Sequence, residues 1–131
     1  MDAAVRHLVR QRAGEWCEYC RLPQDAVEAT FHIEHIVALQ HGGQDDPSNL
    51  ALACDRCNLY KGPNLTSIDS ESGAIVLLFH PRQDTWQDHF VFRGPRLIGL
   101  TSRGRATVQL LNMNAPRRIQ LRIELQATGT M

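Results

Sequence analysis

At 131 residues the chain is long enough to bury a core but short for two independent domains, so we expect one domain. Fourteen Lys and Arg residues balance fourteen Asp and Glu residues, so net charge argues neither for nor against a nucleic-acid partner. The longest apolar run, residues 74–79, is too short to cross a bilayer, and charged residues interrupt positions 1–12, so we expect no membrane span and no signal peptide. These features predict a cytoplasmic protein whose thiols stay reduced.

The first part of the chain is expected to alternate helices with two short strands. Apolar residues three and four positions apart predict a first helix that ends near Gly14. Residues 30–36 alternate and are rich in β-formers, which predicts a strand. In chain order we expect a helix over 5–13, a short helix over 23–29, a strand over 30–36, a loop over 41–47, a strand over 50–53, and a helix with Asp55 as N-cap that carries Cys57, Asn58 and Lys61.

The second part is expected to contain short strands followed by helices. It is also more basic, since the net charge is −3 through residue 62 and +3 after it. An acidic half that can hold a cation therefore adjoins an arginine-rich half that can hold a phosphate backbone. The expected elements are a turn over 69–73, a strand over 75–79, a hairpin that pairs 90–92 with 97–100, a helix from Thr101 or Ser102 to Leu111, and a last helix opened by Pro116.

Two Cys-x-x-Cys pairs, Cys17/Cys20 and Cys54/Cys57, are the most informative feature of the chain. Each pair places two sulfur atoms on a tight turn, so the two pairs together can hold one tetrahedral Zn²⁺. In a reduced compartment, paired cysteines indicate a metal site more than disulfides. A structural zinc at these positions would hold the start of the chain against its middle.

Between and after these pairs the chain carries several motifs in a fixed order. They are Phe31-His32-Ile33-Glu34-His35-Ile36, then Gly42-Gly43, then Ser48-Asn49-Leu50, then Cys54-Asp55-Arg56-Cys57-Asn58-Leu59-Tyr60-Lys61-Gly62. This order resembles the zinc-containing branch of the HNH endonucleases. The resemblance covers roughly the first half of the chain, while residues 78–82, Trp86 and residues 104–107 resemble a C-terminal extension in a group of small bacterial HNH proteins.

The resemblance implies an α+β fold, in which a zinc-stapled ββα-metal finger, a β-hairpin followed by a helix, carries a C-terminal αβ extension. We expect the finger to occupy residues 1–62 and the extension to occupy residues 63–131, packed on the finger as one compact domain. The resemblance also implies that His35 is the general base, that Glu34 and Asn58 are ligands of a catalytic cation, and that Asn49 braces the long loop and so orients His35. Glu34 stands where Asp is frequent in the family, and Asn58 stands where the last His often lies.

The chemistry of these residue types agrees with those roles. Phosphodiester hydrolysis needs a deprotonated water and a cation that neutralises the charge growing on the phosphate. An imidazole such as that of His35 can take a proton near neutral pH. The oxygen atoms of Glu34 and Asn58 favour Mg²⁺ or Mn²⁺ over zinc at the catalytic position. Asn49 lies fourteen positions after His35, and a carboxamide can bond backbone groups across so long a loop.

The sequence thus predicts a divalent-metal-dependent endonuclease that cuts DNA by a one-metal, His-general-base mechanism. The alternative is a zinc-dependent nucleic-acid-binding module without cleavage activity. A dithiol redox protein is disfavoured, since that motif has one Cys-x-x-Cys in a βαβ setting. Nucleic acid, most simply DNA, is the expected partner and a membrane is not, while the sequence sets no oligomeric state. The expected phosphate contacts are Lys61, Arg82, Arg103 and Arg105.

Overall fold

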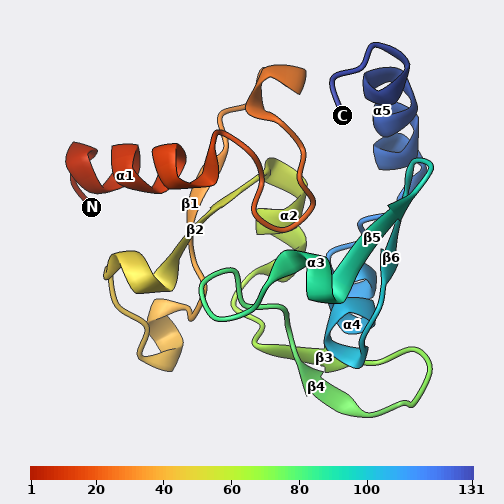
Figure 1. Ribbon diagram of the computed structural model, residues 1–131. Helices are drawn as coiled ribbons and strands as arrows, with labels where there is room; N and C mark the ends of the chain where they lie inside the picture. Colours follow the sequence, from red (N-terminus) through yellow and green to blue (C-terminus); the bar gives the residue numbers. More distant parts are fainter. The chain divides into compact units, whose positions relative to one another are not determined.

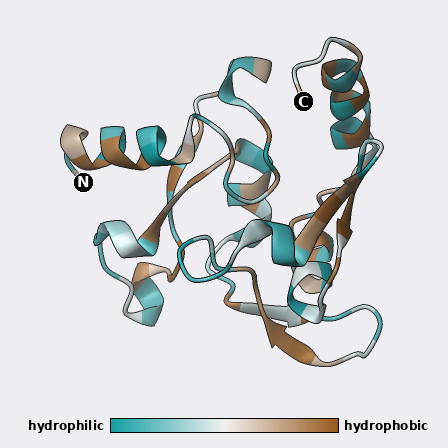
Figure 2. Cartoon of the chain, viewed as in Figure 1, coloured by the Kyte–Doolittle hydropathy of each residue, from teal (hydrophilic) through white to brown (hydrophobic).

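Helix α1 (Ala3–Ala13) opens the chain between two well-formed caps (Figure 1). The Asp2 carboxylate accepts a hydrogen bond from the Val5 N–H at one end, and Gly14 takes the left-handed conformation at the other, with φ of 63°. In Figure 2 the ribbon of α1 alternates between hydrophilic and hydrophobic residues, and Val9 is its buried residue. The expected first helix is therefore present, two residues longer at its start.

The segment after α1 forms a β-hairpin followed by a helix. Strand β1 (His32–His35) pairs antiparallel with β2 (Leu50–Ala53), in a register that sets His32 opposite Ala53 and His35 opposite Leu50. Helix α2 (Asp55–Lys61) follows β2 directly. Three short 3₁₀ helices occupy the connections: Gln24–Ala26, Leu39–His41 and Pro47–Asn49. The predicted ββα arrangement and α+β class are confirmed.

One detail of this segment differs from the expectation. The N-cap of α2 is Cys54, whose sulfur accepts a hydrogen bond from the Cys57 N–H, and Asp55 is the first helical residue. The expected cap was a carboxylate, because Asp is a common N-cap. Here the thiol at Cys54 takes that place, so the helix starts one residue earlier and places Cys57 in its first turn.

The later part of the chain contains two hairpins and three helices. Two of these elements were not predicted: β3, which lies before the expected turn, and the four-residue helix α3. The elements are β3 (Thr66–Ile68) paired with β4 (Ile75–Leu77), α3 (Trp86–His89), β5 (Phe90–Arg93) paired with β6 (Arg96–Gly99), α4 (Ser102–Leu110) and α5 (Pro116–Ala127). Thr101 caps α4, and Pro116 opens α5, as the sequence predicted. None of the helices of the protein is both long and apolar enough to cross a membrane.

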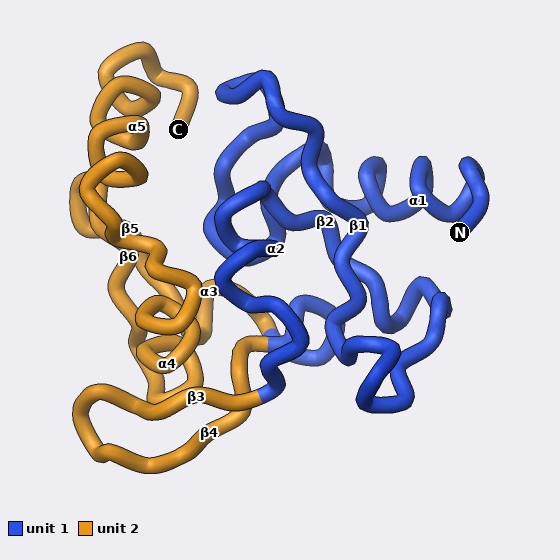
Figure 3. Tube along the Cα trace, turned by 180° about the vertical axis from the view of Figure 1, so that it is seen from behind, with its two compact units in different colours: residues 1–65, 80–84 blue, residues 66–79, 85–131 orange.

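This computed structural model describes all of residues 1–131. Contacts among them divide the chain into two compact units (Figure 3). Unit 1 comprises residues 1–65 and 80–84, and unit 2 comprises residues 66–79 and 85–131. The short segment 80–84 therefore belongs to unit 1 although it comes later in the sequence. Its Arg82 forms an ion pair with Glu18 of that unit. The expected boundary after residue 62 and the packing of both parts into one domain stay predictions.

Each unit has an apolar core of its own. In unit 1 the buried side chains come from α1, the turn of the first cysteine pair, and β2 with the residue before β1, and they include Val9, Tyr19, Phe31, Leu50 and Leu52. In unit 2 they come from both helices and strands, and they include Phe79, Trp86, Phe90, Leu97, Leu111 and Met113. Aromatic rings meet in the second core, where the Phe79 and Phe90 centroids lie 5.1 Å apart in an edge arrangement.

Unit 2 also contains a buried carboxylate that organises the turn between β3 and β4. The Asp69 side chain has no exposed surface and accepts hydrogen bonds from Arg105 Nε at 2.7 Å and Ser72 Oγ at 2.7 Å. These bonds lower the pKa of Asp69 well below its usual range, and the bond from Arg105 has the largest effect. The ionised carboxylate therefore ties the turn to α4.

We predict that Asp69→Asn destabilises unit 2 in a pH-dependent way. A carboxylate whose pKa is lowered by folding contributes stability above its unfolded pKa, about 3.9, and that contribution is lost as the pH falls further. The denaturant midpoint should therefore be lower for the variant at pH 7, and the difference should shrink below about pH 4. Trp86 fluorescence in a Trp16→Phe background reports this transition, and the exposed Asp88→Asn serves as control. A difference that stayed constant with pH would contradict the assignment.

Candidate functional site

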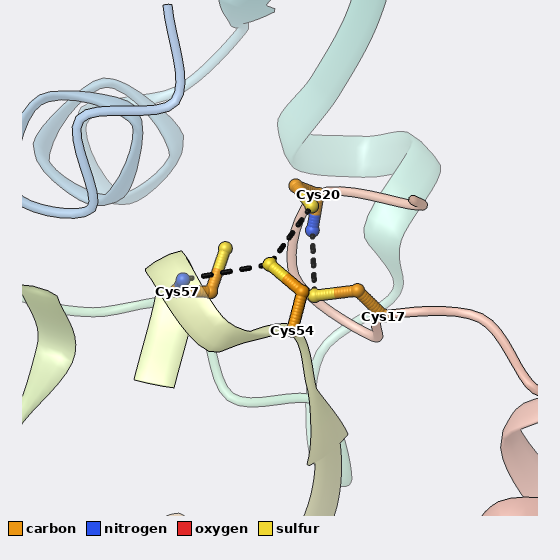
Figure 4. A group of neighbouring side chains, drawn as sticks. All are labelled: Cys17, Cys20, Cys54 and Cys57. Atoms are coloured by element: carbon orange, nitrogen blue, oxygen red, sulfur yellow. Dashed lines mark hydrogen bonds between the residues drawn. The ribbon is translucent and has the colours of Figure 1, made fainter. Parts of the chain in front are cut away.

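The four cysteines of unit 1 form one buried cluster (Figure 4). Cys17 and Cys20 lie on a turn after α1, and Cys54 and Cys57 lie at the start of α2. Their sulfur atoms all lie within 4.8 Å of one another, and the Cys20 and Cys54 sulfurs are 3.7 Å apart. In each pair the N–H of the second cysteine points at the sulfur of the first, at 3.5 Å. Both turns therefore aim their sulfurs at a common point.

The cluster fits a single tetrahedral metal ion. Zn–S bonds of about 2.3 Å in tetrahedral geometry require sulfurs about 3.8 Å apart. The Cys20 and Cys54 sulfurs have this spacing, and all four lie within 4.8 Å of one another. None of the cysteines is in a disulfide. Burial raises the pKa of the Cys17 and Cys57 thiols, so a positive ion is needed to hold them as thiolates. Four thiolate ligands leave no open position, so the metal, for which zinc is the suitable ion, has a structural role.

The cysteine turn is also tied directly to the hairpin. The Glu18 N–H donates to the Leu52 carbonyl at 2.9 Å, and the Glu18 carboxylate accepts from the Leu52 N–H at 2.8 Å. Arg12 donates to the Leu50 carbonyl at 2.8 Å, which fastens the end of α1 to the same strand. These bonds fix the turn that carries Tyr19, whose hydroxyl bonds Glu34 of β1.

A cavity of about 380 Å³ in unit 1 brings together three of the sequence-predicted residues. Glu34 and His35 reach it from the end of β1, and Asn58 reaches it from the middle of α2. Ile33, residues 38–40, Gly62 and Pro63 complete its wall. The carboxamide of Asn58 makes no hydrogen bond within the protein, so its oxygen is free to bind a ligand.

Glu34 is buried, with 6% of its surface exposed, and its two oxygens differ. Oε1 lies 2.8 Å from Lys61 Nζ and accepts a hydrogen bond from the Tyr19 hydroxyl at 3.2 Å. Oε2 is buried and has no partner in the protein. Burial raises the pKa of Glu34, and the Lys61 ammonium and the Tyr19 hydroxyl oppose that rise. An unpartnered buried carboxylate oxygen is costly unless a ligand completes its coordination.

His35 is held by a carboxylate from the following loop. Its Nε2 lies 2.6 Å from Asp45 Oδ1, and this bond lowers the pKa of Asp45. An ionised carboxylate can only accept, so Nε2 carries the proton of this bond. In the neutral imidazole the lone pair is then on Nδ1, which makes no hydrogen bond within the protein. His35 thus has the tautomer of a base with its accepting atom available.

Asn49 closes the loop that connects β1 to β2. Its Oδ1 accepts from the Val37 N–H at 2.8 Å, and its Nδ2 donates to the carbonyls of Val37 and Gln44, both at 2.9 Å. Gly43 packs against the same hydrogen-bonded segment. An added Cβ at Gly43 would come 1.7 Å from the Val37 carbonyl oxygen, so no other residue fits there without movement of the backbone. Asn49 therefore braces the segment that carries Asp45, and through it the orientation of His35.

Three of the four expected phosphate contacts pair with groups of the protein itself, and their role at a nucleic acid stays a prediction. Lys61 is 2% exposed, and its ammonium donates to Glu34 and to the Ile36 carbonyl at 2.9 Å. Arg82 is paired with Glu18, and Arg105 with Asp69. Arg103 lies partly buried on the first turn of α4, in unit 2. A basic residue in the sequence shows charge but not whether that charge has a partner in the fold.

Two residues of this site have no counterpart in the sequence analysis. Tyr19 is one of the two residues between the cysteines of the first pair, and Asp45 is one of two adjacent acids in a loop. Their side chains reach Glu34 and His35 only in the folded chain. Because Tyr19 lies between Cys17 and Cys20, its burial near the hairpin could have been anticipated weakly from the sequence. Nothing in the sequence distinguishes Asp45 from Asp46.

Comparison with known proteins agrees with this geometry. Residues 17–64 match the model of the HNH endonuclease family. Searches of curated proteins and of solved structures found no match to the chain. The matched segment spans the cysteine cluster, the hairpin and α2, so this part of the chain is similar to the HNH endonucleases, and its four cysteines are consistent with the zinc-containing branch. Proteins of this family are usually nucleases.

We predict that the purified chain holds one zinc ion and that Cys54→Ser abolishes its binding. Zinc binding and folding are coupled in such sites, so loss of one thiolate should lower the thermal midpoint of unit 1 as well. Native mass spectrometry and elemental analysis measure the metal, and Trp16 fluorescence in a Trp86→Phe background follows unfolding. Ser70→Ala, at an exposed position of unit 2, is the control. Folded protein of full stability without zinc would refute the structural role.

Proposed function

We propose that the chain is a divalent-metal-dependent endonuclease that hydrolyses phosphodiester bonds in DNA. The observation that carries this proposal is the convergence of Glu34, His35 and Asn58 on one cavity. A base and two oxygen ligands are the set that phosphodiester hydrolysis with one cation requires. The match of residues 17–64 to the HNH endonuclease family supports the same reaction class.

The residues present fit a hard divalent cation. The unpartnered Oε2 of Glu34 and the free carboxamide of Asn58 are both oxygen donors, which suit Mg²⁺ or Mn²⁺ better than zinc. When bound, such a cation neutralises the charge that grows on the phosphate and on the leaving oxygen. Two protein ligands leave positions for water and for phosphate oxygens, as is usual for Mg²⁺ sites.

His35 is the proposed general base. Asp45 holds the Nε2 proton, so Nδ1 takes the proton of the attacking water. Asn49 and Asp45 keep the imidazole in place from the loop, and Glu34 is the adjacent residue of β1, so the base and the proposed ligand are fixed by the same strand. Attack by this water would leave a 5′-phosphate and a 3′-hydroxyl, as the family resemblance implies.

The competing function is nucleic-acid binding without cleavage. It shares the cysteine cluster and differs only in what the cavity does. The two are separated by incubating the zinc-loaded protein with plasmid DNA, single-stranded DNA and RNA, each with Mg²⁺, Mn²⁺ or added Zn²⁺. Cleavage that requires Mg²⁺ or Mn²⁺ supports the nuclease, and binding without cleavage under all conditions supports the binding module.

We predict that His35→Ala keeps the fold, the zinc and the affinity for DNA but loses cleavage by about 10² to 10⁴, the usual contribution of a general base. Plasmid nicking measured over time with Mg²⁺ tests this loss. Circular dichroism, zinc content and DNA binding must be unchanged for the comparison to hold. A variant that cut DNA at the wild-type rate, after contaminating nuclease had been excluded, would show that His35 is not the base.

We predict that Asp45→Asn lowers kcat by about tenfold, the usual effect of losing a group that orients a functional residue, and leaves KM unchanged. The carboxamide can still accept a hydrogen bond, but it no longer enforces the tautomer or stabilises the imidazolium that forms during the reaction. Asp55→Asn is the matched control, because Asp55 is an exposed acid paired with His32 at 3.0 Å away from the cavity wall. Equal effects of the two substitutions would contradict a role for Asp45 in catalysis.

A further inference from the structure

The cavity of the proposed nuclease has an unusual charge balance. Among its wall residues only Glu34 and His35 can carry a charge, while Asn58 is neutral and the remaining groups are apolar, amide or backbone. The charge of Glu34 is matched by the ammonium of Lys61 at 2.8 Å, and Tyr19, the other residue bonded to it, is a neutral donor. Asp45 is outside the wall and already pairs with His35. The cavity therefore has no uncompensated negative charge.

Lys61 cannot leave this position for solvent as a surface lysine can. Its side chain is 2% exposed, and a second hydrogen bond to the Ile36 carbonyl, at 2.9 Å, holds the ammonium in place. Ile36 follows the catalytic strand β1 directly, and Lys61 is the last residue of α2, one turn after Asn58. The counterion is thus fixed to both elements that supply the proposed ligands. A buried ammonium without Glu34 would be an unpaired charge, so the pair is kept together.

A divalent cation at Glu34 must share the carboxylate with this ammonium. One oxygen is occupied by Lys61 and Tyr19, and the other, Oε2, is unpartnered. Two positive charges on one buried carboxylate repel each other, and burial weakens the screening of that repulsion. Sites that capture Mg²⁺ or Mn²⁺ from solution usually supply net negative charge, from carboxylates or from the phosphates of a bound substrate. Here the protein supplies none in excess.

We propose that Lys61 is an internal counterion that makes stable cation binding at Glu34 and Asn58 depend on the phosphate of a bound nucleic acid. This inference rests on the proposed function, because it uses the same cavity and the same substrate class. The phosphodiester adds the negative charge and the oxygen ligands that the protein lacks. Since coupling between two ligands is reciprocal, the cation must also tighten the binding of the nucleic acid. The nuclease would then hold its reactive cation only when a substrate is present.

The first test measures this coupling in the zinc-loaded His35→Ala protein, which binds without cutting. Mn²⁺ binding is followed by electron paramagnetic resonance with and without a DNA duplex, after subtraction of Mn²⁺ bound to the duplex alone. We expect Mn²⁺ to bind at least about tenfold more tightly with DNA, and DNA to bind more tightly by the same factor with Mn²⁺. Glu34→Gln in the same background should remove the coupling. Equal Mn²⁺ affinity with and without DNA would overturn the proposal.

The second test removes the counterion. Lys61→Met keeps a long flexible side chain without the charge, so Glu34 becomes the uncompensated acid of the cavity. We expect Mn²⁺ to bind this variant about tenfold more tightly than the parent in the absence of DNA, and the coupling to DNA to shrink, since repulsion of this kind is worth one or more powers of ten. Arg56→Met removes a positive charge from the exposed side of α2 and should change neither quantity.

The outcomes separate this inference from the proposed function. Weaker or unchanged Mn²⁺ binding in folded Lys61→Met protein would overturn the counterion role and leave Lys61 as a residue that only positions Glu34. A chain that bound no nucleic acid at any salt concentration would overturn the proposed function and, with it, the substrate dependence. A Lys61→Met protein that failed to fold would leave the coupling in the His35→Ala protein as the deciding measurement, since that experiment does not alter Lys61.

Discussion

The four-thiol cluster is the constraint on which the rest of unit 1 depends. It joins a turn near the start of the chain to the first turn of α2, and both segments carry residues that bond Glu34 or line its cavity. Tyr19 comes from the first turn, and Asn58 and Lys61 come from the helix that begins at Cys54. A hairpin with one short helix buries too little apolar surface to be stable alone. A metal at the cluster compensates for this shortage, and it also sets where the helix meets the hairpin.

Buried polar contacts then arrange the cavity within that frame. Glu34, Lys61 and Tyr19 form a network whose members are all largely removed from water. Burying an ion pair gains little stability by itself, because the desolvation cost offsets the attraction. Such a network is better understood as a device that fixes one orientation of a carboxylate. The single unpartnered atom in it, Oε2 of Glu34, is where a ligand is still needed.

The arginine-rich part of the chain uses much of its charge inside the fold. Arg105 binds the buried Asp69, and Arg122 donates to the carbonyls of Pro95 and Met113 while it is 3% exposed. Arg82 belongs to unit 1, where it neutralises Glu18. The positive net charge of this half therefore does not translate into a row of free guanidinium groups. Interactions with a phosphate backbone have to be sought among side chains that the fold leaves exposed.

Local sequence patterns determined most helices and strands of this protein and the membership of its four-cysteine cluster. The Cys-x-x-Cys pairs, the alternation over 30–36 and the caps at Gly14, Thr101 and Pro116 act within a few residues, so the helices, the ββα order and the thiol cluster were predictable. Motif order also selected Glu34, His35, Asn49 and Asn58 as candidate site residues, and their roles stay predictions.

Only the tertiary structure decided which partners these residues have. Lys61 is the end of a helix in the sequence, where a lysine is usually solvated, but the turn of α2 against β1 buries it beside Glu34. Asp45 reaches His35 because Asn49 folds the loop back over the strand. The physical reason is the range of the interactions: propensity and capping act between near neighbours, whereas the pairing of buried charges depends on which distant segments the chain brings together.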